Sequence, residues 1–92
     1  MKTYLIGYDL NKEGQNYNSL ISEIKKLGNW WHCLDSTLII KSNSSAVIIR
    51  NHLSKFIDEN DKLLVVRLEG EGAWLGFDTD CSNWLKNNLS YN

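Results

Sequence analysis

The hydrophobic pattern of the chain changes period twice within its first thirty residues. Residues 3–9 are rich in β-branched and aromatic side chains and end in Asp9, which predicts a strand that leads into the turn-prone segment 11–14. Apolar residues then recur every three or four positions from Tyr17 to Leu27, with Gly28 directly after them. This spacing predicts an amphipathic helix with a glycine stop.

The next forty residues repeat the order with an additional strand. Residues 30–41 are strand-like on both sides of Asp35 and Ser36, which predicts two consecutive strands with a break or bulge between them. Polar residues 42–45 offer N-caps for a helix whose apolar positions share one face. Residues 62–68 are almost continuously Leu and Val and predict the last main strand. We expect a loop at 69–72 and a short third helix within 81–89.

The predicted order is βαββαβ followed by a tail. Right-handed crossovers fold this order into a four-stranded antiparallel sheet with both long helices on one face, which is the ferredoxin-like plan of the α+β class. We therefore expect a single domain over residues 1–92, with a core over about 1–68 and a C-terminal aromatic extension over about 69–92. A chain of 92 residues is near the lower size limit for one hydrophobic core, which excludes a second domain.

Three of the predicted strands are apolar on both faces. A half-solvated antiparallel sheet alternates apolar and polar positions, so the face without helices should also be covered. We expect this cover to be the sheet of a second copy, because closed two-fold homodimers dominate small oligomers. The alternative is that the tail, with Trp74, Phe77 and Trp84, folds across that face of its own chain.

Charge and cysteine content narrow the functional classes. Ten Lys and Arg against eleven Asp and Glu give a formal charge of −1, so nucleic-acid binding would need a local patch. Cys33 and Cys81 form no Cys-x-x-Cys motif and lie far apart in the sequence, which predicts reduced, partly buried thiols. The N-terminus has no signal-peptide pattern and no stretch reaches membrane-spanning length, so we expect a cytoplasmic protein.

Asp9 is the leading candidate for chemistry. It ends the first predicted strand beside a glycine-containing loop, where a short acidic side chain can face a cleft. Two Asp9 carboxylates brought together at a dimer axis, with water and a substrate phosphate, would form a site for Mg²⁺ or Mn²⁺. The alternative is that Asp9 stabilises the turn at Asn11, which is a common role for Asp.

Trp30, Trp31 and His32 form a second candidate group. Neighbouring residues of a strand point to opposite faces, so we expect one Trp in the core and the other at the surface, where it can stack on a base. His32 can act as a general acid or base, or contact a phosphate when protonated. A packed aromatic strand with a surface His is the alternative. Residues 69–80 carry four carboxylates and several glycines but match no cofactor motif.

Tyr8-Asp9-Leu10, read together with residues 31–40 and 61–66, makes the chain resemble the small CRISPR-associated Cas-two family. It is most similar to the stand-alone Cas-two-like proteins often labelled SinR-family, and more distantly to the VapD toxins. The likeness spans residues 1 to about 68 in element order and length. It implies a ferredoxin-like homodimer with stacked sheets and a metal-dependent phosphodiesterase, whose metal-binding Asp falls on Asp9 and whose third-strand Ser falls on Ser36.

The chain departs from that family in its charges. The family carries a basic cluster in the first helix and second strand, whereas this chain has Lys12, Lys25 and Lys26 but uncharged residues at 15, 16, 30 and 31. Lost phosphate contacts lower nucleic-acid affinity steeply. The tail is also longer and more aromatic than the family's usual strand extension.

Together these features predict a homodimer that binds RNA or another nucleotide-containing ligand through Tyr8, Lys12, Trp30 and Trp31. Hydrolysis of phosphodiester bonds with Mg²⁺ or Mn²⁺ at Asp9, with His32 or Ser36 orienting the reacting group, is the expected chemistry. One alternative is a non-catalytic dimeric module that holds a small nucleotide or a protein partner by stacking. Another is an interaction protein of a toxin–antitoxin or CRISPR system, whose edge strand recruits another chain.

Overall fold

The computed structural model describes residues 1–11 and 17–89. The elements follow the order β1 (Lys2–Asp9), α1 (Tyr17–Lys25), β2 (Trp30–Leu34), β3 (Thr37–Ser42), α2 (Ala46–Leu53), the short 3₁₀ helix η1 (Ser54–Phe56), β4 (Lys62–Leu68) and α3 (Thr79–Asn88). The predicted strands and the first two helices are confirmed. The C-terminal segment is more regular than the name aromatic extension implies, because α3 makes up ten of its residues.

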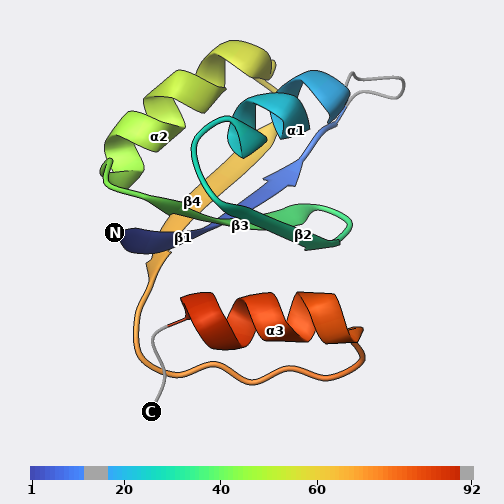
Figure 1. The fold of residues 1–92 in the computed structure, drawn as a ribbon. Coiled ribbons are helices and arrows are strands. Elements are labelled where there is room, and N and C mark those ends of the chain that lie inside the picture. The colour runs from blue at the N-terminus through green and yellow to red at the C-terminus, as the bar shows by residue number, and fades with distance from the viewer. Residues whose placement is uncertain (12–16, 90–92) are drawn as a thin grey trace.

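The four strands form one antiparallel sheet in the order β2-β3-β1-β4. Helices α1 and α2 cover one face, and α3 lies across the other (Figure 1). β1 pairs with β4 from Thr3 opposite Leu68 to Asp9 opposite Lys62. The α+β class and the four-stranded antiparallel sheet are therefore confirmed.

Local side-chain contacts determine where the helices begin and how β2 is reached. Ser45 caps α2 by accepting a hydrogen bond from the Ile48 amide at 3.2 Å, as expected for a serine N-cap. Gly28 separates α1 from β2, and a Cβ at this position would clash with the main-chain oxygen of Lys41. Glycine thus lets the connection pass directly against β3, where the Lys41 amide donates to the Asn29 oxygen at 2.9 Å.

The main core lies between the sheet and the helices α1 and α2. Burying this apolar surface is the largest favourable contribution to folding. Its fully buried side chains come from two strands and both helices: Ile6, Leu20, Ile24, Leu38, Ile40, Ile49 and Leu53. Tyr4 and Tyr8 are also buried, and their hydroxyls donate to the carbonyl oxygens of Ser44 at 2.7 Å and Asp35 at 3.1 Å.

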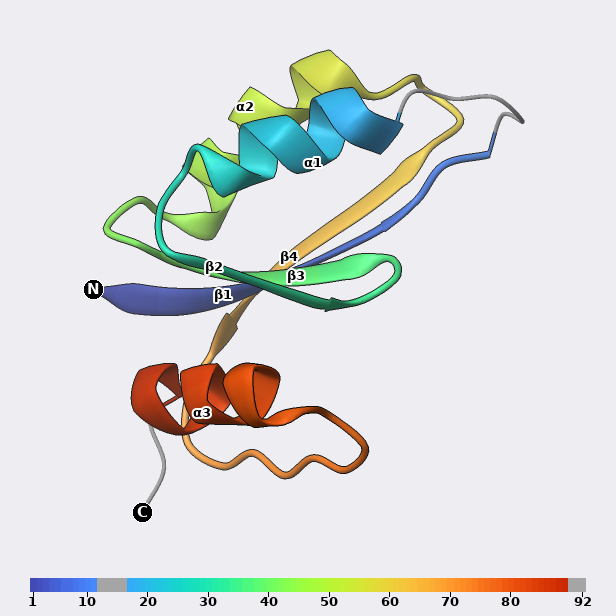
Figure 2. The same cartoon turned by 45° about the vertical axis from the view of Figure 1, so that its right-hand side comes forward.

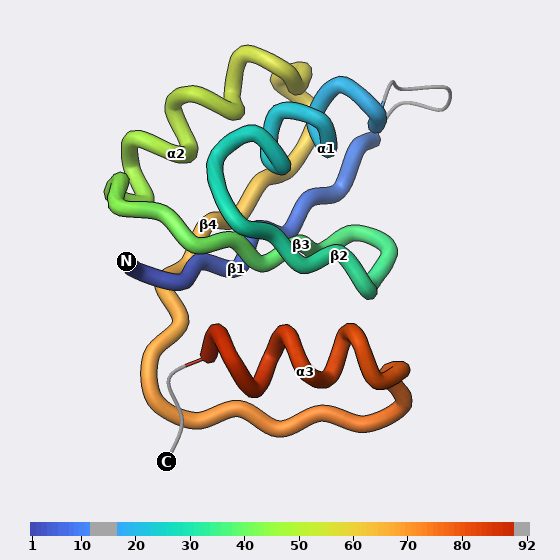
Figure 3. The backbone as a smooth tube through the Cα atoms, in the orientation of Figure 1, coloured from blue at the N-terminus to red at the C-terminus, as the bar shows by residue number. Residues whose placement is uncertain are grey.

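A second, smaller core lies on the opposite face of the sheet, under α3. Trp31, Ile39 and Leu85 are buried there, and Trp74 and Phe77 pack against them. The tail therefore folds across this face of its own chain, which was the alternative to a stacked second sheet. Figures 2 and 3 show α3 between the sheet and the connecting segment, which runs along the helix on its outer side.

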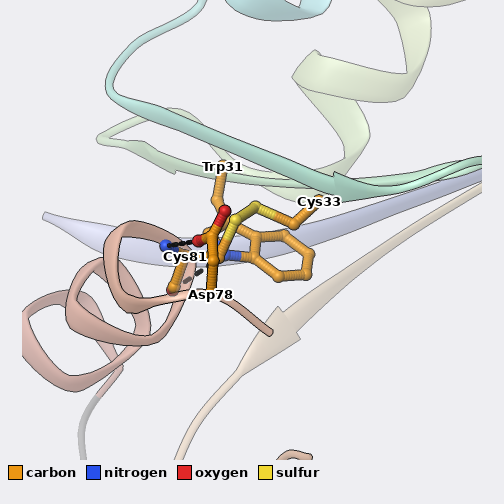
Figure 4. Close-up of a disulfide and its surroundings, with 4 residues drawn as sticks. All are labelled: Trp31, Cys33, Asp78 and Cys81. Atoms are coloured by element: carbon orange, nitrogen blue, oxygen red, sulfur yellow. Dashed lines mark hydrogen bonds between the residues drawn. A yellow bond between two sulfur atoms is a disulfide. The ribbon is translucent and has the colours of Figure 1, made fainter. Parts of the chain in front are cut away.

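A disulfide between Cys33 and Cys81 ties β2 to α3 (Figure 4). The two Cα atoms are 6.4 Å apart, within the usual range for disulfides. The prediction of two reduced thiols is therefore wrong. A separation of 48 residues gave no sign of proximity, because the two cysteines meet only when α3 lies across β2.

Among residues 1–11 and 17–89, no helix combines the length and the apolar character that crossing a bilayer requires.

Candidate functional site

α3 leaves part of its face of the sheet uncovered, beside β4. Leu63 and Val65 pack into the main core on the helix side, so Leu64 and Val66 point to the α3 side. Their side chains remain 56% and 36% exposed. This exposed apolar strip borders a shallow hollow of about 270 Å³, which we call the Gly7 hollow. It is lined by Gly7, Tyr8, Asp9, Lys62, Leu63 and Leu64.

Asp9 and Lys62 bring opposite charges to one end of the Gly7 hollow. They are cross-strand partners at the last pair of the β1–β4 ladder, and both are exposed. The Asn11 amide donates to Asp61 at 2.9 Å rather than to Asp9. Asp61 therefore stabilises the turn at Asn11. The alternative interpretation of the sequence gave this role to Asp9.

The turn between β2 and β3 lies beside the same end of β1. The Tyr8 amide donates to the Ser36 oxygen at 3.1 Å, and the Tyr8 hydroxyl donates to the Asp35 oxygen at 3.1 Å. The structure therefore brings Asp9 and Ser36 to one end of the sheet. Burial raises the pKa of the Tyr8 phenol, and the nearby Tyr17 and Asp35 raise it further. Tyr8 thus stays a neutral hydrogen-bond donor at neutral pH.

An apolar groove of about 330 Å³ adjoins the Gly7 hollow. Its floor comes from the sheet and its other wall from the tail: Leu5, Trp31, Leu34, Thr37 and Ile39, then Gly72, Ala73, Trp74, Leu75, Phe77, Leu85 and Leu89. Thr37 lines the groove, Gly7 lines the hollow, and the two residues are direct cross-strand partners. The apolar groove therefore continues toward the end of the sheet where Asp9 and Lys62 supply both charges.

Trp31 and Trp30 differ in exposure, as predicted, and neither lies beside Asp9. Trp31 is 4% exposed, donates from Nε1 to the Cys81 oxygen at 3.1 Å and meets the Phe77 ring edge-on at 5.1 Å. Its indole is therefore a core side chain and is not available to stack on a base. Trp30 is 42% exposed beneath the Lys25 ammonium, which lies 4.1 Å from the ring centroid.

The sheet register places these tryptophans away from the candidate end. Trp31 and Leu5 both pair with Ile39, so Trp31 lies at the level of Leu5, four residues before Asp9 along β1. His32 stands between Trp31 and Cys33, which both face α3, so alternation directs it to the helix side. Asp9 alternates with the buried Tyr8 and lies on the α3 side. The structure thus separates His32 from Asp9 and Ser36.

Asp9 supplies a carboxylate to which a divalent ion could bind at this end of the sheet. Mg²⁺ and Mn²⁺ prefer about six oxygen ligands, several of them from water or substrate. Within the part of the chain that the structure describes, no three His, Cys, Asp or Glu side chains gather in one place. A metal ion at Asp9 would therefore need further ligands from beyond the described residues, from water or from the bound molecule. Lys12, a predicted ligand contact, lies outside the described residues.

Gly7, Lys62 and the apolar groove were missed by sequence reasoning. A glycine inside a strand can mark a close approach of a ligand, and Gly7 stands in the middle of the first predicted strand. That signal was available in the sequence. The position of Lys62 opposite Asp9 was not, because it depends on the β1–β4 register.

No protein-family model matches the chain, and no solved structure matches it significantly. The resemblance to the Cas-two family therefore remains a prediction that rests on the sequence motifs.

Proposed function

We propose that this protein is a cytoplasmic, ferredoxin-like homodimer of the Cas-two-like kind that binds RNA or another nucleotide-containing ligand. One nucleotide would occupy the apolar groove and the Gly7 hollow. The observation that carries this proposal is the pairing of Gly7 with Thr37, which joins the two surfaces. The sheet order β2-β3-β1-β4, with α1 and α2 on one face, supports the ferredoxin-like plan.

The two surfaces match the two chemical parts of a nucleotide. The groove has a volume of about 330 Å³, at the lower end of the range for small-ligand sites. Trp74 and Leu34 line it and can contact the flat face of a base. Lys62 supplies a cation for a phosphate, and Asp9 supplies an acceptor for a sugar hydroxyl.

The charge balance indicates that stacking contributes most of the affinity. The chain has a formal charge of −1, and among the described residues Lys62 is the cation that lines the Gly7 hollow. Binding that neutralises about one phosphate falls only about as the first power of the salt concentration. We therefore expect a shallow salt dependence, in contrast to a protein with a basic groove.

The test is a titration that follows tryptophan fluorescence, with adenosine monophosphate and a short single-stranded RNA as probes. Lys62→Gln should weaken binding about tenfold, since a hydrogen bond to a charged group contributes about 1.5 kcal/mol. Lys26→Gln is the matched control, because Lys26 is exposed in the turn after α1, on the helix side of the sheet. Equal affinity of the wild type and Lys62→Gln, or no binding of either probe, would contradict the proposal.

Metal-dependent cleavage of the bound RNA is a second candidate function. It is favoured by the exposure of Asp9 at the strand end, beside the turn that carries Ser36. The metal ion would be Mg²⁺ or Mn²⁺, and it would need ligands in addition to Asp9. Cleavage that depends on added metal and is lost in Asp9→Asn, with binding retained, would support this function. Binding without cleavage by the wild type would leave the non-catalytic module.

A further inference from the structure

The sheet has two edge strands, and they differ in how they are protected. Edge strands invite pairing with other chains unless bulges, charges or a covering element prevent it. β2 has a register irregularity between Trp31 and Leu34 and is tied to α3 by the disulfide. β4 has a regular seven-residue ladder with β1. Within the described part of the chain, no backbone hydrogen bond joins β4 to any segment other than β1.

The exposed side chains in the middle of β4 are apolar. Leu64 and Val66 are 56% and 36% exposed on the α3 side, next to the Gly7 hollow. Lys62 and Arg67 lie near the two ends of the strand, so its centre carries no charge that would oppose pairing. An open, regular edge with an apolar centre is therefore available on one side of the sheet.

We infer that β4 pairs antiparallel with β4 of a second copy of this chain, with Val65 at the two-fold axis. This inference rests on the homodimer in the proposed function and specifies its interface. Directly opposed residues of an antiparallel pair share one face, so a residue of the α3 side must meet another of the α3 side. Only registers that obey this rule keep the side chains of the helix side on one face of the joined sheet and those of the α3 side on the other.

Centring the pair on Val65 is the register that uses the whole strand. Every residue from Lys62 to Leu68 then has a partner, because the strand extends three residues to each side of Val65. Leu64 lies opposite Val66 of the second copy, and this exposed apolar pair occurs twice by symmetry. Arg67 reaches the end of the second copy's strand, where Asp61 precedes Lys62. The apolar pattern of the strand is thus self-complementary.

This pairing has a consequence for the ligand sites. The two four-stranded sheets become one continuous sheet of eight strands, with both Gly7 hollows on the same face. The two Lys62 residues are six positions apart along the paired strands, or about 20 Å at the usual rise of an antiparallel strand. One single-stranded RNA can then occupy both sites, whereas a mononucleotide occupies one.

Sedimentation equilibrium of the ligand-free protein tests the interface. We expect a dimer whose dissociation constant rises about tenfold or more in Leu64→Lys and in Val66→Lys, because each change removes the same opposed apolar pair at both symmetry-related places. Ile48→Lys is the matched control, since Ile48 is 60% exposed but lies on α2, on the helix side of the sheet. A wild type that stays monomeric overturns the inference.

A cross-linking experiment tests the register itself. Mild oxidation of a mixture of Leu64→Cys and Val66→Cys should give a covalent dimer, because directly opposed Cβ atoms lie within disulfide reach. Leu64→Cys alone should give far less, because two copies of position 64 are only diagonal neighbours. Suppose that Leu64→Lys still forms a dimer and that the mixture cross-links no better than Leu64→Cys alone. The β4 interface is then wrong, although the protein is a dimer. Nucleotide binding by a monomer overturns the dimer but leaves the ligand site standing.

Discussion

Tyr8 connects the main core with the candidate site. Its ring is 6% exposed among the core side chains, while its amide and hydroxyl both donate to the β2–β3 turn. It therefore fixes Asp35 and Ser36 relative to Asp9. The sequence predicted Tyr8 as a ligand contact, whereas its buried ring indicates a positioning role.

The raised pKa of Tyr8 predicts an alkaline loss of stability. A phenol whose pKa is raised in the folded state binds its proton more tightly than the unfolded chain does. Its contribution is complete below the unfolded pKa of about 10 and is lost as the pH rises through the higher folded value. In Tyr8→Phe this pH-dependent part should vanish, and loss of the bond to Asp35 should cost about 1 kcal/mol at neutral pH.

Urea denaturation of both proteins near neutral pH and above about pH 10 measures this effect, since other tyrosines contribute equally to the two curves. The stability gap between the wild type and Tyr8→Phe should narrow at high pH. A gap that stays constant would show that Tyr8 titrates alike in the folded and unfolded chain.

The sequence predicted some residues at this end of the sheet and missed others. Asp9 and Ser36 were chosen from position and resemblance, and the structure places them at one end of the sheet. His32 was chosen for its chemistry, but strand alternation directs it away from Asp9. Lys62 was missed, because the charge that faces Asp9 depends on a pairing between positions more than fifty residues apart.

At the scale of elements, α3 is the least expected part of the fold. Its existence was predicted, but whether the tail or a second copy of the chain covers this face of the sheet was left open. Asp78 caps it by accepting a hydrogen bond from the Cys81 amide at 2.8 Å. Its packing is strengthened by Thr3, whose hydroxyl donates to the Asn88 oxygen at 3.1 Å. The hydrophobic period of a strand or helix is visible in a short stretch of sequence. The position of α3 depends instead on contacts with strands that are far away in the sequence.

The disulfide should contribute a large share of the stability. In the chain-entropy account, a cross-link that closes a loop of 48 residues stabilises the folded state by about 4 kcal/mol. Addition of a thiol reductant should therefore lower the free energy of unfolding by about that amount. Cys33→Ser should be equally destabilised and insensitive to the reductant.

Urea denaturation with and without reductant, together with a thiol count on the denatured protein, checks this prediction. Free thiols in the untreated protein, or equal stability of the wild type with and without reductant, would contradict the disulfide. Disulfides are rare in the reducing cytosol, so a confirmed disulfide would also count against the predicted cytoplasmic location.

At the scale of the whole molecule, the covered sheet face changes how a dimer can form. Apolar residues on both faces of the strands indicated that the second face is covered, and the tail provides this cover. Stacking of two complete sheets is therefore not needed to bury that face. The apolar surface that remains on the α3 side of β4 borders the Gly7 hollow, so association and ligand binding would share one side of the molecule.

The central claim is that a nucleotide binds where the apolar groove meets the Gly7 hollow. Its most direct test is a titration of ¹⁵N-labelled protein with a short single-stranded RNA, followed by amide chemical shifts. We predict the largest changes at Gly7, Asp9, Thr37 and Lys62, with little change in α1 and α2. Changes confined to the helix side, or none at saturating RNA, would contradict the account.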